Sequence, residues 1–146
     1  MTGRVLLDTN ILIYATLVSD PRHPKATALL AARTGLGNEY FVSAQNLAEM
    51  YPNLTGPKTN PPDSPAMAKA KISSLAALDR LTVLPITRSV VERALELCAA
   101  AKVTRQRYFD FQIAALMQLE GIPTIATEND KDFVGIPGIV AVNPFA

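Results

Sequence analysis

The chain has 146 residues, of which 49% are apolar and 18% are charged, and its formal net charge is +1. This composition excludes a disordered chain, and the net charge is too small to indicate a nucleic-acid partner by itself. The single cysteine, Cys98, excludes an internal disulfide, and no apolar run reaches the roughly 18 residues of a membrane span. Asp8 and Asn10 interrupt the apolar N-terminus, so we expect no signal peptide, a cytoplasmic protein and one domain over residues 1–146.

Short apolar stretches alternate along the chain with longer stretches of helical character. We expect strands at residues 4–7, 40–43, 81–86, 124–127 and 139–142. We expect helices at residues 11–19, 24–33, 44–54, 65–79, 88–101 and 108–120. This alternation predicts an α/β sandwich in which helices pack on a central, mainly parallel sheet.

Several residues mark where these helices begin. Ser43 and Thr87 stand directly before two of them and can accept hydrogen bonds from N–H groups of the first turn. Ser64 precedes Pro65, a pair typical of a helix start because proline has no N–H to leave unsatisfied there. Residues 55–65 hold four prolines and one glycine, so we expect a loop within the domain.

Three acids lie within apolar sequence, and they are the main functional signal of the chain. Asp8 stands in VLLDTNILIYA, Glu49 in SAQNLAEMY and Asp110 in YFDFQIAALM. A carboxylate is rarely buried without a partner, yet no Lys or Arg lies within three residues of Asp8 or Glu49. Several such acids in one crevice would repel one another unless they held a hard divalent cation. Metal-dependent phosphoester chemistry is therefore the leading hypothesis.

The predicted sheet brings these acids to one edge. Asp8 follows the first strand and the acidic stretch 127–133 (TENDKDF) follows the strand at 124–127. Both therefore lie at the carboxyl ends of strands, where open parallel sheets bind ligands. Asp110 falls in the first turn of its helix, where the helix dipole favours an ionised carboxylate. Glu49 lies further along its own helix, so the acids could converge from separate segments.

Each acid also has a purely structural interpretation. Asp8 could simply cap the helix that follows it, and Glu49 could lie on a solvated helix face. Asp110 could pair with Arg105 or Arg107, and the acidic stretch could be an ordinary charged turn. Their joint placement at one edge of the sheet favours a metal site over these alternatives.

Five segments, taken together and in order, resemble the PIN-domain family, and most of all its VapC-type ribonuclease toxins. They are LLDTNILIYA, SAQNLAEMY, YFDFQIAALM, GIPTIATENDKDF and IVAVNPF, and they extend over the whole chain. The resemblance implies a PIN-like three-layer sandwich and a nuclease centre that depends on Mg²⁺ or Mn²⁺. It also implies an RNA substrate, a small cognate antitoxin and frequent homodimers.

By this resemblance, Asp8, Glu49 and Asp110 are the family's three main catalytic and metal-binding acids. Thr127 matches the threonine that follows the last core strand. The family often has an acid two residues after that threonine, where this chain has Asn129. The neighbouring acids that could replace it as a metal ligand are Asp130, Asp132 and Glu128.

The expected reaction is hydrolysis of an RNA phosphodiester. The ion would lower the pKa of a water molecule and neutralise charge on phosphorus, and a second ion near Asp130 or Asp132 could stabilise the leaving oxygen. The residues expected to orient waters or ligands from behind the acids are Thr9, Asn10, Thr127 and Asn129.

Positive charge has to hold RNA beside such an acidic centre. Lys102, Arg105 and Arg107 lie just before Asp110, at the positive end of its helix, and could contact phosphates that flank the cut. A solvated basic loop, or ion pairs with the acids of the site, explains the same residues equally well. Weaker candidates are Arg4, Lys58 and Lys131.

Two other functions fit parts of the pattern. Asn129, in place of an acid, would suit an inactive PIN scaffold that binds RNA or a protein without cleaving it. A phosphatase of the haloacid-dehalogenase type would need a second aspartate two residues after the first, whereas Asp8 is followed by Thr9 and Asn10. We therefore rank the nuclease first, the inactive scaffold second and the phosphatase third.

Overall fold

The computed structural model describes residues 3–31 and 38–146, and its centre is a sheet of five strands. The strand order is β3–β2–β1–β4–β5, and every neighbouring pair is parallel. The strands are β1 (Gly3–Leu7), β2 (Asn38–Ser43), β3 (Leu81–Leu84), β4 (Thr124–Ala126) and β5 (Val140–Val142). The predicted α/β sandwich is confirmed, and all five carboxyl ends lie at one edge of the sheet.

Helices connect the strands, and the capping residues expected from the sequence begin three of them. Ser43 caps α3 in a capping box with Asn46, Ser64 caps α4, and Thr87 caps α5. The helices are α1 (Thr9–Tyr14), α2 (His23–Ala31), α3 (Ala44–Thr55), α4 (Pro65–Ala76), α5 (Arg88–Ala101) and α6 (Tyr108–Glu120). Two 3₁₀ helices are η2 (Arg105–Arg107), directly before α6, and η3 (Asp130–Phe133), after β4.

The structure differs from the predicted elements mainly at their ends. α1 stops at Tyr14, earlier than predicted, because the hydroxyl and the N–H of Thr16 both bond to the Ile13 carbonyl and close a tighter turn. β3 ends before Pro85, which has no N–H to donate to the ladder. The predicted end of the second helix, near residue 33, lies outside the described residues.

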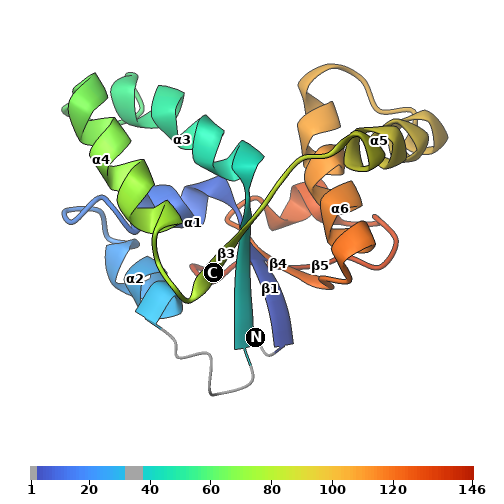
Figure 1. Ribbon diagram of the computed structural model, residues 1–146, viewed down its shortest axis with the longest axis horizontal. Coiled ribbons are helices and arrows are strands. Elements are labelled where there is room, and N and C mark those ends of the chain that lie inside the picture. The colour runs from blue at the N-terminus through green and yellow to red at the C-terminus, as the bar shows by residue number, and fades with distance from the viewer. Residues whose placement is uncertain (1–2, 32–37) are drawn as a thin grey trace.

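The core lies in two layers, one on each face of the sheet. In β1, Val5 and Leu7 point into the layer formed with α1–α4, and Leu6 points into the layer formed with α5 and α6. All three side chains are fully buried, which is typical of a central strand covered on both faces. Figure 1 shows the same division, with α1–α4 on one side of the sheet and α5 and α6 on the other.

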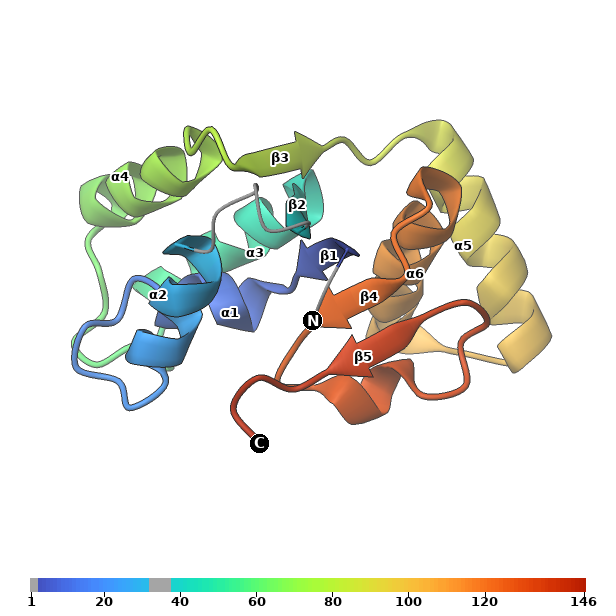
Figure 2. The same cartoon turned by 90° about the horizontal axis from the view of Figure 1, so that it is seen from below.

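This division separates the two helices that carry Glu49 and Asp110. Figure 2 shows α5 and α6 packed against each other on the side of β4 and β5, while α3 lies with α1, α2 and α4. α3 follows directly from the end of β2, so its first turn lies at the carboxyl edge of the sheet. No helix in the described ranges is long and apolar enough to cross a membrane.

Candidate active site

A cavity of about 420 Å³ lies at the edge of the sheet where the strands end. Asp8, Glu49 and Asp110 all line it, although they come from the end of β1, from α3 and from α6. The structure thus brings together the three acids that the sequence singled out. The other residues that line the cavity include Thr9, Asn10, Tyr14, Arg22, Lys58 and Asn129.

Asp8 is held by hydrogen bonds to both of its carboxylate oxygens. Oδ1 accepts from the Thr9 N–H at 2.8 Å and from the Asn46 side chain at 3.3 Å, and Oδ2 accepts from the Thr127 hydroxyl at 2.7 Å. Burial raises the pKa of Asp8 above its usual range, although the hydrogen bonds from Thr127 and Thr9 oppose that rise. Two nearby carboxylates raise the pKa of Asp8 further. Asp8 does cap α1, but its second oxygen is bonded outside that helix.

Glu49 also has both carboxylate oxygens bonded. The Thr9 hydroxyl donates to Oε2 at 3.1 Å, and the Gln45 side-chain amide donates to Oε1 at 2.6 Å. The Thr9 hydroxyl in turn accepts from the Asn46 side chain at 3.1 Å. Asn46 is fully buried, and its oxygen is fixed in the capping box of α3. Neutral donors, rather than cations, therefore position Glu49 beside Asp8.

Asp110, in the first turn of α6, is partly buried and has no side-chain hydrogen bond within the described parts of the chain. Its pKa is raised to about 6, first by burial and then by the carboxylates of Asp132 and Asp8, against the opposing charge of Arg107. This shift is opposite in direction to the one that the helix dipole, by itself, was expected to give. No ion pair joins Asp110 to Arg105 or Arg107 in the residues that the structure describes.

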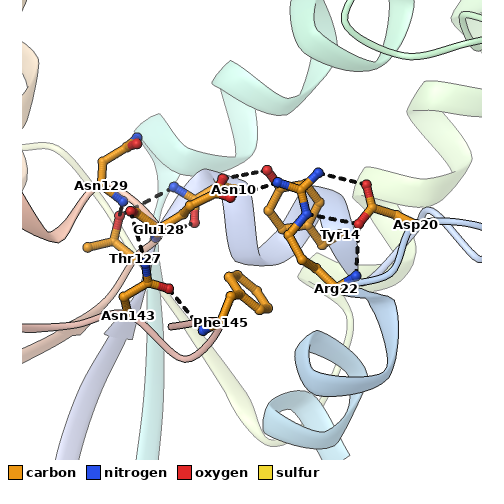
Figure 3. Close-up of polar contacts among 9 residues, drawn as sticks. All are labelled: Asn10, Tyr14, Asp20, Arg22, Thr127, Glu128, Asn129, Asn143 and Phe145. Carbon is orange, nitrogen blue, oxygen red and sulfur yellow. Dashed lines mark hydrogen bonds and ion pairs between the residues drawn. The ribbon is translucent and has the colours of Figure 1, made fainter.

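The acids that follow β4 are not equivalent. Glu128 lines the cavity, but its carboxylate accepts hydrogen bonds from the Tyr14 hydroxyl and from Arg22, the latter at 2.7 Å (Figure 3). Asp132 lies close enough to the two aspartates of the cavity to raise the pKa of both. Asp130 is not among the groups that most affect those two pKa values. Asp132 is thus the one of the three whose charge affects both aspartates, although it does not itself line the cavity, and the Glu128 carboxylate is already engaged by the Arg22 guanidinium.

Asn10, Thr127 and Asn129 form a hydrogen-bonded frame behind Asp8 (Figure 3). The hydroxyl of Thr127, a fully buried residue, accepts from the Asn10 side-chain amide at 3.3 Å and from the Asn129 N–H at 3.0 Å. The same hydroxyl donates to Asp8, so the position of that carboxylate depends on the frame. The Asn10 oxygen accepts from the Glu128 N–H at 3.1 Å, which ties the segment after β4 to α1.

The basic residues expected to hold RNA are placed in different ways. Arg107 lies beside the site, where its guanidinium donates to the carbonyl oxygen of Asp132 at 2.7 Å. Lys102 and Arg105 are exposed, and both have left-handed backbone conformations, with φ of 56° and 58°. Of the three, only Arg107 is among the groups that most affect the pKa of Asp110.

The three weaker basic candidates lie in different parts of the structure. Lys58 lines the cavity together with the acids. Lys131 is exposed in η3. Arg4 lies at the opposite edge of the sheet, where its guanidinium donates to the carbonyl oxygen of Gly121 at 3.2 Å beyond the end of α6. That position removes Arg4 from the candidates for contact with RNA at the cavity.

Two side chains that contact these acids, Gln45 and Arg22, and one that contacts Gln45, Gln112, were not expected from the sequence. Gln45 stands four residues before Glu49, the spacing of neighbours on one helix face, so this spacing could have identified it. Arg22 binds Glu128 across 106 residues of sequence, and no local pattern signals that pair. Gln112 bonds to Gln45 across 67 residues, and it too could be found only in the folded chain.

The donor set fits a hard divalent cation in its chemistry. Asp8, Glu49 and Asp110 offer carboxylate oxygens, the ligands that Mg²⁺ prefers, and none of them takes part in an ion pair between described residues. The raised pKa values of Asp8 and Asp110 show that negative charge is poorly compensated there. In the described parts of the chain, no three Asp, Glu, His or Cys side chains stand close enough to hold one ion in their present rotamers. Binding would therefore require at least one carboxylate to turn inward, and Asp110 is the acid whose side chain has no hydrogen bond to another described residue.

Comparison with known proteins agrees with this architecture. The family model for the PIN domain matches residues 5–139. Ribonuclease VapC24 of Mycobacterium tuberculosis is 30% identical over 129 residues, which cover 87% of this chain and 87% of that protein.

Solved structures with the same fold include toxins and toxin–antitoxin complexes. A toxin–antitoxin complex from Klebsiella pneumoniae contains a chain that is 28% identical, with a TM-score of 0.60 and coverage of 96% of this chain and 97% of that chain. VapC20 of Mycobacterium tuberculosis, described as a toxin that cleaves the sarcin–ricin loop, has a TM-score of 0.69 at 18% identity, with coverage of 92% and 98%. VapBC2 of Rickettsia felis, bound to promoter DNA, has a TM-score of 0.66 at 22% identity, with coverage of 96% and 98%.

Proposed function

The chain belongs to the PIN-domain family, and from that premise we propose that it is a metal-dependent endoribonuclease and the toxin of a toxin–antitoxin pair. One observation carries the proposal. Asp8, Glu49 and Asp110 meet in one cavity with neutral hydrogen-bond donors and no ion-pair partner among the described residues. Such a site binds a cation and, through it, a phosphodiester.

The residues have distinct roles in this proposal. Asp8, Glu49 and Asp110 would hold Mg²⁺ or Mn²⁺, and Asp132, whose charge raises the pKa of Asp8 and Asp110, would help to hold a second ion. When bound, such an ion supplies positive charge at the phosphodiester and acidifies a water molecule. Hydrolysis would add water across one P–O bond, so that one RNA fragment keeps the phosphate and the other ends in a hydroxyl group.

The side chains around the acids prepare the site before any substrate arrives. Thr127 and Asn46 hold Asp8 in one orientation, and Thr9 links Glu49 to the start of α1. Because these donors are neutral and buried or partly buried, they fix the carboxylates without cancelling their charge. Asp110 has no such donor in the described residues, and it is the acid that can turn most freely toward an ion.

The RNA strand would cross the cavity between basic groups on two sides. Arg107 lies beside Asp110, and Lys58 lines the cavity. Lys102 and Arg105, which are exposed, would contact phosphates further from the cut. Ribonuclease VapC24 and the Klebsiella complex support an RNA substrate and a small antitoxin partner. A homodimer is part of the same proposal by family resemblance.

The test is mapping of new 5′ ends in total bacterial RNA incubated with the purified protein, in Mg²⁺ or in chelator. We expect ends at a few sites that need metal and disappear in Asp8→Asn. Asp79→Asn is the matched control, because Asp79 is an exposed aspartate in the turn before β3. Equal cleavage by Asp8→Asn and wild type would refute the assignment.

An inactive scaffold is the second candidate, because Asn129 stands where the family often has an acid, and its side chain lines the cavity. Absence of new ends in Mg²⁺ and Mn²⁺, after separation of any co-purified inhibitor, would favour this scaffold. Binding of RNA without cleavage would then be its expected property.

A further inference from the structure

Four side chains form a hydrogen-bonded chain that runs from α6 to α3 and ends on Glu49. The Tyr108 hydroxyl donates to the Gln112 side-chain oxygen at 2.8 Å, and the Gln112 amide donates to the Gln45 oxygen at 2.7 Å. The Gln45 amide then donates to the Glu49 carboxylate at 2.6 Å. Gln112 is only 8% exposed, and a buried polar side chain is stable only when it is hydrogen-bonded.

The Glu49 carboxylate sets the donor-to-acceptor direction of this series of hydrogen bonds. A carboxylate can only accept, so the Gln45 NH₂ group faces Glu49 and the Gln45 oxygen faces Gln112. The Gln112 NH₂ group must then face Gln45, which leaves its oxygen to accept from Tyr108. Burial raises the pKa of Tyr108, so its hydroxyl remains protonated and able to donate. Each amide therefore has one orientation, and aligned bonds of this kind strengthen one another.

The bridge between Gln45 and Gln112 joins two parts of the fold that pack separately. α3, which carries Glu49, packs into the core layer of α1, α2 and α4, whereas α6, which carries Asp110, packs into the layer shared with α5. Within the described residues, two hydrogen bonds join α3 to α6, and both involve Gln45. One is the bond from the Gln112 amide to the Gln45 oxygen, and the other runs from the Gln45 amide to the Phe109 carbonyl at 3.4 Å. The position of Glu49 relative to Asp110 thus depends on this junction.

We propose that Gln45 and Gln112 are positioning residues that hold the Glu49 carboxylate for a divalent cation, an inference that rests on the proposed nuclease function. Gln45 donates to Oε1 of Glu49 and Thr9 donates to Oε2. Each oxygen keeps a lone pair that can face the cavity. Partners of this kind, which stand behind a ligand, orient it and typically change metal affinity about 10–100-fold when removed.

The decisive variant is Gln112→Leu, which removes the bridge without touching any of the three acids. Mn²⁺ binding to the whole chain would be measured by calorimetry, and RNA cleavage would be followed over a range of Mn²⁺ concentrations. We expect Gln112→Leu to weaken Mn²⁺ binding about ten-fold and to raise the Mn²⁺ concentration for half-maximal cleavage by the same factor. The rate at saturating Mn²⁺ should stay near that of wild type, because all three acids remain.

Gln118→Leu is the matched control on the same helix. The Gln118 amide donates to the carbonyl oxygen of Pro137 at 2.8 Å, and its oxygen accepts from Arg93, on a part of α6 that does not line the cavity. This variant should bind Mn²⁺ as wild type does. Wild-type affinity in Gln112→Leu would overturn the inference, and so would an equal loss in Gln118→Leu.

Two further measurements exclude a general loss of structure. In chelator, the side-chain amide NMR signals of Gln45 should shift in Gln112→Leu while the signals of the β1 backbone stay in place; unchanged Gln45 signals would show that the bridge does not exist. The double variant Gln45→Leu/Gln112→Leu should bind Mn²⁺ no more weakly than Gln45→Leu alone, because the two residues act through one hydrogen bond. Additive losses would contradict the proposal.

Asp8→Asn separates failure of this inference from failure of the nuclease proposal. If Asp8→Asn loses Mn²⁺ binding and Gln112→Leu does not, the positioning role is wrong and the metal site stands. If wild type binds Mn²⁺ no better than Asp8→Asn, the metal site is wrong and the positioning role falls with it.

Discussion

The carboxylates that line the cavity form two groups, and the charge of each group is compensated differently. Asp20 and Glu128 form the paired end, and Asp8, Glu49 and Asp110 form the unpaired end. At one end, Glu128 and Asp20 both bind the guanidinium of Arg22, at 2.7 and 2.8 Å (Figure 3). The guanidinium carbon also lies 3.7 Å from the centre of the Tyr14 ring. Hydrogen bonds from Arg22 hold the pKa of Asp20 below its usual range.

At the other end, neutral donors hold Asp8 and Glu49, and Asp110 has no side-chain hydrogen bond to another described residue. Here the pKa values of Asp8 and Asp110 are raised, first by burial and then by neighbouring acids. Aspartates that line one cavity therefore have pKa values shifted in opposite directions, lowered for Asp20 and raised for Asp8 and Asp110. The paired end joins the turn before α2 to the segment after β4, and its ion pairs are formed without a ligand. The unpaired end is destabilising by itself, and the proposed cation would compensate its charge.

The largest expected effect comes from removing an acid at the unpaired end. Asp8→Asn keeps the size of the side chain and can still accept a hydrogen bond from Thr127, but it loses the charge that an ion requires. We expect cleavage to fall on the order of 10³-fold at matched Mg²⁺, because metal assistance supplies several kcal/mol of transition-state stabilisation. Initial rates on a mapped RNA substrate would measure it.

Asp20→Asn is the corresponding change at the paired end. Asp20 lines the same cavity, but its carboxylate is bonded to Arg22. Cleavage should stay within a small factor of wild type. Equal losses in Asp8→Asn and Asp20→Asn would show that the cavity acts as one charged surface and that the two ends do not differ in role.

A smaller effect, on stability, is expected when the Arg22 guanidinium is removed from the paired end. Arg22→Gln leaves Asp20 and Glu128 as unpaired acids that face each other across the missing guanidinium. Because Arg22 is partly exposed, water screens part of this cost, and we expect the free energy of unfolding to fall by about 1–2 kcal/mol. Urea denaturation in chelator at neutral pH would measure the change.

The control for that loss is an exposed ion pair. Arg88 pairs with Glu92 on the surface of α5, so Arg88→Gln should change the free energy of unfolding by only about 0.5 kcal/mol or less. If Arg22→Gln lowered the free energy of unfolding no more than Arg88→Gln does, the ion pairs of Arg22 would stabilise the fold no more than a surface pair. The paired end would then have no structural role that distinguishes it from the unpaired end.

The contrast between the ends also shows which features the sequence can predict. The alternation of strands and helices, the caps at Ser43 and Thr87 and the position of Asp8 at a strand end depend on local patterns, and the structure has them where expected. The convergence of the acids follows from parallel strands, because their carboxyl ends share one edge.

Features that depend on distant side chains could not be predicted in this way. Glu128 was a candidate metal ligand in sequence, but whether it is free depends on Arg22, which lies 106 residues away. Asp110 was expected to be favoured as an anion by its helix dipole, but its burial against acids from other elements raises its pKa. In both cases the tertiary environment determines the charge state and the partners of the carboxylate, and the spacing of residues along the sequence does not reveal that environment.

The last expected effect has the opposite sign, because an acid at the unpaired end destabilises the folded state without metal. The pKa of Asp110 is raised to about 6, so the folded chain keeps this proton at a pH where the unfolded chain has lost it. Stability should therefore fall as pH rises from about 4 to about 6 and stay low above that window. Asp110→Asn cannot ionise, so in chelator at pH 7 it should be more stable than wild type by roughly 1–2 kcal/mol, and the gap should close below about pH 4.

Added Mn²⁺ should reverse this order, because a cation stabilises the folded wild type by mass action more than it stabilises a variant that lacks one ligand. Thermal unfolding of wild type and Asp110→Asn at pH 4 and pH 7, each with chelator and with Mn²⁺, would measure all four cases. Lower stability of Asp110→Asn in chelator at pH 7 would mean that the Asp110 carboxylate has a structural partner. In that case the unpaired end would resemble the paired one, and the argument for a cation site at Asp110 would fail.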